Sequence, residues 1–359
     1  GELPDVTAES FRGDGNLATG GEGTAILEQL HDILPGAKLY FSNNDSELTF
    51  VESINWLADR CDVIAGDEVF TGLGPEDGDS YVERAMTKAA EKTLAITWAA
   101  GNAARNHYQA YYWDPDGDGW HNFSSNKEYV TCSVKPGGTL MITLSWDDHF
   151  LMERMNDFSL QAKPLDIGYP ILRSQPYKLN AGIEPIGDSF SNLGYPVELL
   201  TYENESGERE YFRVYIDGPW DPQHRLLKLS INGNKGGRLE EFIVPQNSIG
   251  SIAVSKGITT SGAYDSITAC TETGAELGED SIGSWAYTIE PFSSFGWTSD
   301  GRMLPSTCFP DRINTYSDFW NWDLPDSKPE HATVVGGDGL GSSMTCDDAA
   351  AYDVVLNAD

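Results

Sequence analysis

Hydrophobic and polar positions follow two different periods along the first hundred residues. In three segments apolar residues recur three or four positions apart, which predicts helices with one buried face. These segments are 25–34, 48–58 and 82–90. Short continuous apolar runs lie between and after them, as expected of strands buried on both faces. These runs are 39–41, 62–65 and 94–98. The alternation predicts an α/β fold, a parallel sheet with helices on both faces. The stretch 1–20 is polar and glycine-rich and shows no strong periodicity.

The pattern changes after Asn102, and from about 106 to 245 only short alternating runs occur, which predict strands. Turn residues such as Pro136-Gly137-Gly138 separate these runs. We therefore expect an all-β sandwich, jelly-roll-like, inserted into the α/β domain. The chain returns to that domain near 246 and ends in an Ala-rich helix. The predicted domains are 1–105, 106–245 and 246–359.

The charge of the chain limits its partners. The net charge is −33, from 56 acidic and 23 basic residues. Such a surface repels nucleic acid and anionic membranes, so neither is an expected partner. No apolar run approaches membrane-spanning length. The composition suits a secreted protein in a calcium-rich or saline setting.

Cysteines and glycosylation motifs add little to this picture. The five cysteines have no CxxC spacing, which argues against zinc and allows at most two disulfides and one free thiol. Three Asn-x-Ser triplets, at Asn44, Asn122 and Asn204, are weak signs of secretion. No signal peptide is recognised at Gly1, so we expect a mature or trimmed form.

Two polar turns carry candidate chemistry. The glycine-rich stretch 336–341 leads to Ser342 and Ser343 at the start of the last predicted helix. Ser343 there either caps the helix or acts as a nucleophile, because free N–H groups favour developing negative charge. In the second turn, Asp114, Asp116 and Asp118 alternate with Pro115, Gly117 and Gly119, as in calcium loops. Ser125 stands where such loops carry a bidentate glutamate, so a solvated acidic turn is the alternative to a Ca²⁺ site.

Four stretches resemble the subtilase (subtilisin-like serine peptidase) family, in that family's order. They are Glu22-Gly23-Thr24-Ala25 followed by Pro35-Gly36-Ala37, then Ala99-Ala100-Gly101-Asn102, then the segment 289–296, and then Gly341-Ser342-Ser343-Met344. The resemblance implies a subtilisin-like α/β fold and hydrolysis of peptide bonds. It implies that Ser343 is the nucleophile and that the Asn102 amide stabilises the oxyanion. The insert resembles the β-sandwich of some secreted subtilases.

The departures from the family are equally specific. Glu22 replaces the catalytic histidine, and Asp347-Asp348 replaces a Pro-His pair. We match no residue to the catalytic aspartate, whose strand we expect before Gly1. Sedolisins, the serine-carboxyl relatives, use a glutamate base, but they carry aspartates where this chain has Ile26 and Asn102.

Asp67 is the candidate partner of Glu22. It follows the strand 62–65, and the carboxyl end of this strand should lie beside that of the strand before Asn102, where ligands of such sheets bind. Two close carboxyls that share a proton give one acid and one base. Alternatively, Glu22 only stabilises the start of its helix. His107 and His331 are further candidates for the base, whereas we expect His31 to be structural.

Two main functions remain open, together with a weaker third. One is a secreted serine endopeptidase acting on a peptide or protein substrate. Another is an inactive pseudopeptidase with a structural or binding role in an extracellular assembly, by self-assembly or with an N-terminal segment. A glycan-binding module built on the aromatic-rich insert has less support.

Overall fold

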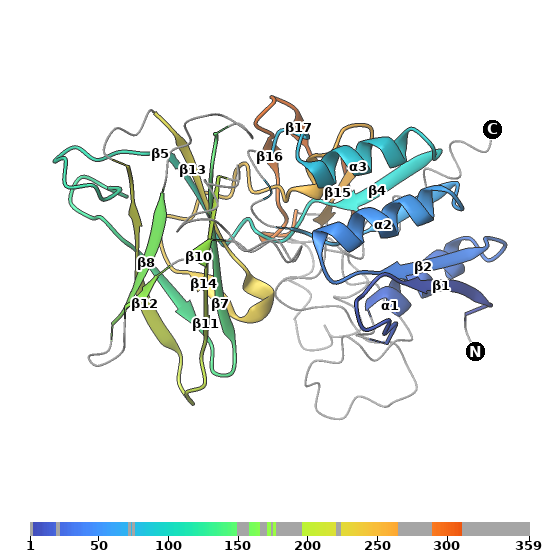
Figure 1. Ribbon diagram of the computed structural model, residues 1–359, viewed down its shortest axis with the longest axis horizontal. Coiled ribbons are helices and arrows are strands. Elements are labelled where there is room, and N and C mark those ends of the chain that lie inside the picture. The colour runs from blue at the N-terminus through green and yellow to red at the C-terminus, as the bar shows by residue number, and fades with distance from the viewer. Residues whose placement is uncertain are drawn as a thin grey trace, which may run out of the picture.

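The computed structural model describes most of the chain up to residue 310. The described residues are 3–18, 22–70, 73, 76–148, 158–165, 171–173, 175–176, 196–219, 224–264 and 289–310. They form a mixed α/β fold of several sheets, with many strands and few helices (Figure 1). Ser343 and Asp347-Asp348 lie outside the described residues.

The first part of the chain alternates helices and strands as predicted. Its helices are α1 (Glu22–Ile33), α2 (Glu47–Ala58) and α3 (Tyr81–Ala90). Its strands are β2 (Leu39–Asn43), β3 (Val63–Gly66) and β4 (Ala95–Ala99). Both α2 and α3 begin with a capping box, built on Ser46 and Ser80. In each, the serine side chain accepts from a free backbone N–H, which fixes where the helix begins.

The main parallel sheet draws on both the early and the late part of the chain, as expected, but it lacks one of the predicted strands. It contains four parallel strands in the order β18-β15-β4-β3, with β15 (Thr259–Tyr264) and β18 (Thr307–Pro310) supplied by the later part of the chain. Strand β2 pairs instead with β1 (Val6–Ser10), in a separate two-stranded parallel sheet. The stretch 1–20, which shows no strong periodicity, therefore holds a strand. β1 was missed because three of its five residues are exposed, so it has no alternating hydrophobic pattern.

The middle of the chain forms two five-stranded antiparallel sheets, seen at the left of Figure 1. One has the order β10-β11-β7-β13-β5 and the other β14-β6-β12-β8-β9. Their bounds are β5 His107–Tyr111, β6 Val130–Val134, β7 Thr139–Trp146, β8 Ser159–Pro164, β9 Leu172–Arg173, β10 Gln175–Pro176, β11 Val197–Glu203, β12 Glu210–Asp217, β13 Leu226–Ile231 and β14 Gly237–Leu239. Between 106 and 245 the described residues include no α-helix, only these strands and the short 3-10 helix η2 (Gly233–Lys235).

Two separate hydrophobic cores hold the molecule together. One lies between the two antiparallel sheets and includes Trp146, Phe158 and Phe212, all at most 1% exposed. The other joins α2, α3 and the parallel sheet with the 3-10 helix η3 (Ile252–Val254). The division of the chain into domains, with limits at 105 and 245, stays a prediction. A buried ion pair between Lys228 on β13 and Glu76 connects the two parts.

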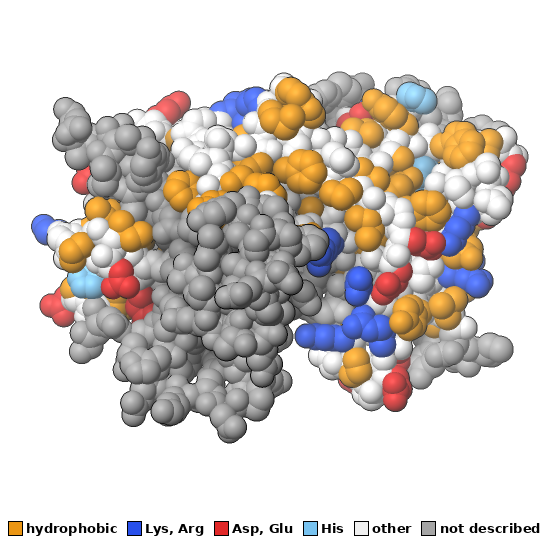
Figure 2. Space-filling model, turned by 180° about the vertical axis from the view of Figure 1, so that it is seen from behind, with side chains coloured by type: hydrophobic (Ala, Val, Ile, Leu, Met, Phe, Trp, Pro, Cys, Tyr) orange, Lys and Arg blue, Asp and Glu red, His pale blue; other side chains and the backbone are white. Residues whose placement is uncertain are grey.

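A short antiparallel pair, β16 (Gly296–Trp297) with β17 (Met303–Leu304), completes the described strands. On the face opposite Figure 1, hydrophobic side chains form several groups with acidic and basic side chains between them (Figure 2). Among the described residues, no helix has the length and apolar character needed to cross a membrane.

Candidate functional site

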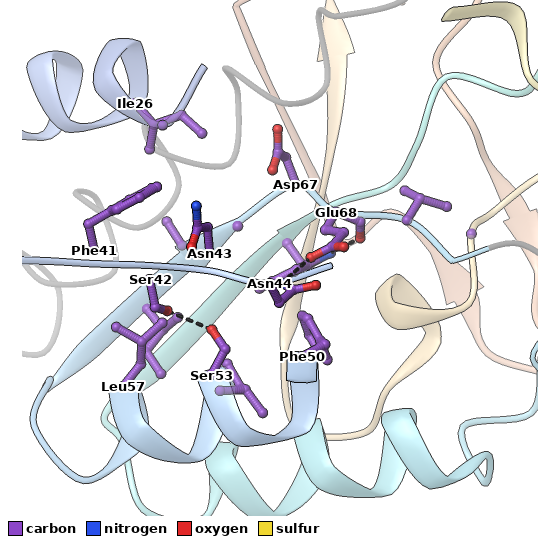
Figure 3. Close-up of a pocket in the computed structure, with 18 of the residues that line it drawn as sticks. Ile26, Phe41, Ser42, Asn43, Asn44, Phe50, Ser53, Leu57, Asp67 and Glu68 are labelled. Atoms are coloured by element: carbon purple, nitrogen blue, oxygen red, sulfur yellow. Dashed lines mark hydrogen bonds between the residues drawn. The ribbon is translucent and has the colours of Figure 1, made fainter. Parts of the chain in front are cut away.

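A cavity of about 1240 Å³ lies between strands β2 and β3. Residues of both strands line it, and α1 and α2 lie on opposite sides of β2 (Figure 3). The cavity reaches the first antiparallel sheet, where Thr143 and Ser230 contribute to its wall. It therefore lies where the two parts of the fold meet, a common place for ligand sites.

Three of the predicted positions meet at this cavity. Asp67 follows β3 and Asn102 follows β4, and both line the wall, as do Gly23 and Thr24 in the first turn of α1. This agrees with the rule that the carboxyl ends of parallel strands meet at one edge of the sheet. Glu22 is the first residue of α1, but its side chain, like Ser343, lies outside the described part of the structure. The catalytic roles of these residues stay predictions.

Gly23 explains how α1 comes so close to β2. A Cβ at this position would lie 2.3 Å from the ring of Phe41, a distance that no side chain tolerates. Only glycine allows the first turn of α1 to rest on that ring. Packing against Phe41 therefore explains the glycine of the Glu22-Gly23-Thr24 motif, independently of the role of Glu22.

The turn that carries Asn102 is held by a distant segment of the chain. Gly101 has φ +101°, which favours glycine. The Ser294 N–H donates to the Gly101 carbonyl at 2.9 Å, and the Ala103 N–H donates to Ser294 Oγ at 3.0 Å. Ser294 belongs to the segment 289–296, so two of the stretches identified in the sequence lie side by side. The structure thus fixes the backbone on both sides of Asn102.

Glu68 is a candidate site residue that the sequence analysis missed. Asn44 Nδ2 donates to Glu68 Oε2 at 2.7 Å, and Trp98 Nε1 donates to the Glu68 carbonyl at 2.8 Å (Figure 3). Burial raises the pKa of this carboxyl to about 7, with Asp67 and Glu47 adding to the rise and the Asn44 bond opposing it. A carboxyl of this kind can donate or accept a proton near neutral pH. The only sign in the sequence was its place directly after Asp67 at the end of a strand.

The histidines of the described part do not line the cavity. His107 is 1% exposed, and its Nδ1 donates to the Val244 carbonyl at 2.7 Å. Burial lowers its pKa to about 4, so it stays neutral. His107 thus has a structural contact here, and its suggested use as a base stays a prediction. His331 lies outside the described residues.

The acidic turn has the geometry of a compact carboxylate cluster. One ligand oxygen from each of Asp114, Asp116 and Asp118 lies within 4.8 Å of the others. Asp114 accepts the N–H groups of Gly117 and Gly119 at 2.8 and 2.9 Å, which fixes the turn. The spacing suits an oxygen-liganded cation. Calcium binding stays a prediction.

In two of the three Asn-x-Ser triplets the asparagine is buried. Asn204 is 1% exposed, and its Nδ2 donates to the carbonyls of Val134, Lys135 and Glu208. Asn122 is 5% exposed. A glycan on either side chain is incompatible with this packing, so these triplets give no support for secretion.

Comparison with known proteins gives a likeness of fold. The CspB protease of Clostridium perfringens is similar in structure, with a TM-score of 0.51 and 12% sequence identity. The similarity covers 90% of this chain and 65% of that protein, so this chain spans about two thirds of its length. No family model matches the chain, and no curated protein is similar to it in sequence. The likeness is one of fold alone.

Proposed function

We propose that the chain is a secreted subtilisin-like serine, or serine-carboxyl, endopeptidase that hydrolyses peptide bonds through Ser343. The observation that carries the proposal is the meeting of Asp67, Asn102 and the first turn of α1 at one cavity. These positions lie in separate parts of the sequence, and the family resemblance assigns each a role in the same site. The protease-like fold adds support.

In this proposal each residue has one task. Ser343 attacks the peptide carbonyl, and Glu22 accepts its proton. The Asn102 amide stabilises the oxyanion of the tetrahedral intermediate. Asp67 tunes the pKa of Glu22, since two close carboxyls hold one proton between them over an intermediate pH range. Activity should therefore be highest at acidic pH and fade as both carboxyls ionise.

The alternative is a pseudopeptidase that kept the scaffold and lost the chemistry. The observation that favours it is the lack of a histidine among the described cavity residues, together with Glu22 at the expected histidine position. Asp347-Asp348 beside the serine turn would also oppose an oxyanion.

A fluorophosphonate probe, which labels activated serines, separates the two proposals. The protein is incubated with the probe from acidic to neutral pH, and the labelled peptide is identified by mass spectrometry. A peptidase is labelled at Ser343, and both Ser343→Ala and Glu22→Gln abolish labelling without loss of the circular dichroism spectrum. If folded protein remains unlabelled at every pH, only the pseudopeptidase proposal stands.

Calcium binding at Asp114, Asp116 and Asp118 belongs to the same proposal as a structural site. It would neutralise an acidic turn whose three carboxylates do not line the cavity. Neither the peptidase nor the pseudopeptidase depends on it.

A further inference from the structure

The antiparallel sheet β14-β6-β12-β8-β9 carries basic and aromatic side chains on its outer face. Its strands β12 and β8 lie at the end of the molecule farthest from the helices (Figure 1). Along β12 the side chains of Phe212 and Val214 are buried in the core, so those of Tyr211, Arg213 and Tyr215 lie on the outer face. The Tyr211 side chain is 42% exposed. One strand thus presents a ring, a cation and a second ring at alternate positions.

Two cations lie directly opposite one another at the centre of this face. Arg213 on β12 is paired with Lys163 on β8 in the register of the two strands. Like charges at such positions, with Cβ atoms about 5 Å apart, destabilise a sheet. Lys163 Nζ lies 4.1 Å from the centre of the Tyr215 ring. The guanidinium carbon of Arg213 lies 4.8 Å from the centre of the Tyr129 ring. The two rings hold the cations on the face and offset part of their repulsion.

Neither of these cations has a carboxylate partner among the described residues, and neither has Arg173 on β9. Lys127, which also lies over the Tyr129 ring, binds Glu241 at 2.6 Å. The chain has 56 acidic residues for 23 basic ones, so carboxylate partners are abundant. Two opposed cations without such a partner make the centre of this face complementary to an anion from outside the chain.

The arrangement of rings and cations fits a polysaccharide of uronic acids. Adjacent strands lie about 4.8 Å apart, close to the length of one pyranose residue. A sugar chain that crosses the strands can therefore place successive carboxylates beside Arg213 and Lys163, and the exposed Tyr211 ring offers an apolar surface to a sugar. An extended acidic peptide fits less well, because its side chains on one face repeat every second residue, about 6.8 Å apart.

We propose that the outer face of this sheet binds an anionic polysaccharide of uronic acids. The sugar chain lies across β12 and β8, with its carboxylates on Arg213 and Lys163 and a sugar ring against Tyr211. Arg173 extends the face onto β9. None of these four residues lines the cavity, so the proposal does not rest on the proposed peptidase activity.

The net charge of −33 confines this binding to the face itself. At physiological salt charges are screened beyond about 8 Å, so acidic side chains elsewhere repel a short oligosaccharide only weakly. The acidic turn 114–118 borders the face through Trp120, whose N–H donates to Asp118 Oδ1 at 3.0 Å and whose ring meets the Tyr215 ring edge-on. A chelator is therefore kept in every solution, so that no Ca²⁺ ion bridges this turn and the ligand.

The probe is a hexamer of galacturonic acid, titrated calorimetrically into the protein at low salt. Two matched ligands define the chemical class. The fully methyl-esterified hexamer keeps the sugar and removes the charge, whereas hexaglutamate keeps the charge and removes the sugar. The acidic hexamer should bind about tenfold more tightly than either, and its affinity should fall as salt rises. Equal binding of hexaglutamate would refute the proposal and would mean that the face takes any polyanion.

Matched variants test the place. Arg213→Gln and Lys163→Gln should each weaken binding of the acidic hexamer about fivefold. Tyr211→Ser should weaken it by about the same factor. Arg84→Gln removes an exposed cation from α3, and Tyr111→Ser removes a 53% exposed ring from the other antiparallel sheet. Neither of these two controls should change binding.

Urea denaturation separates binding from a structural role. Because Arg213 and Lys163 repel one another, Arg213→Gln should leave the denaturation midpoint unchanged or raise it. A lower midpoint with unchanged binding would overturn the proposal, since the contact with the Tyr129 ring would then be the whole role of Arg213. Absence of binding to the folded wild type would overturn it as well.

Discussion

Replacement of the buried carboxyl Glu68 by glutamine should change how the stability of the protein depends on pH. Glu68→Gln keeps the shape of the side chain, and its amide oxygen can still accept the Asn44 bond, 2.7 Å long in the structure. What the substitution removes is the ability to ionise. Any pH-dependent difference between the two proteins therefore reports on Glu68.

The direction and size follow from the raised pKa. Burial, Asp67 and Glu47 raise the pKa of Glu68 from 4.5 to about 7 in the folded protein. Folding thus favours the protonated form, so this stabilisation is full below pH 4.5 and is lost as pH rises through about 7. Each unit is worth about 1.36 kcal/mol, so the loss is at most about 3 kcal/mol. Partial exposure to the cavity reduces it.

The assay is urea denaturation of both proteins from about pH 4 to about pH 8. The wild type should lose stability relative to Glu68→Gln across this range, by no more than about 3 kcal/mol. Glu52→Gln, which removes an exposed carboxylate from α2, controls for the change in net charge. A constant difference between wild type and Glu68→Gln, or a wild type that gains relative stability as pH rises, would refute the reasoning about burial.

Three other changes test separate parts of the structure. Gly23→Ala should destabilise the protein by about 1–3 kcal/mol, measured by urea denaturation, because its Cβ would meet the Phe41 ring, and a normal stability would contradict that contact. Lys228→Met should cost about 3–5 kcal/mol by leaving Glu76 buried and unpaired, whereas the double variant with Glu76→Gln should recover much of this. Calorimetry on chelator-treated protein should show Ca²⁺ binding that Asp116→Ala abolishes, and equal heats for both proteins would exclude the site.

Sequence patterns were sufficient to locate the helices and most of the predicted strands. The segments 48–58 and 82–90 have a clear 3.6-residue period and lie within or close to α2 and α3. The short alternating runs after Asn102 predicted strands such as β7 and β13. Both patterns indicate that one side of a helix or strand is buried. They can be detected in the sequence because they involve residues that are close together along the chain.

The way the strands associate could not be predicted in the same way. β1 is mostly exposed and therefore has no hydrophobic pattern. The division of the parallel strands into two sheets, with a cavity between β2 and β3, depends on which edges pair. Backbone hydrogen bonds make these pairs, and they are almost independent of the side chains that a sequence displays.

The candidate site could likewise be predicted only in part from the sequence. Asp67 and Asn102 could be placed together from the sequence, because residues that follow parallel strands share one edge of the sheet. The importance of Glu68, the support of the Asn102 turn by Ser294 and the structural contact of His107 could not. Each of these features depends on burial, on a partner that is distant in the sequence, or on both. Only the folded chain determines the local dielectric and the partners that set a pKa or complete a hydrogen bond.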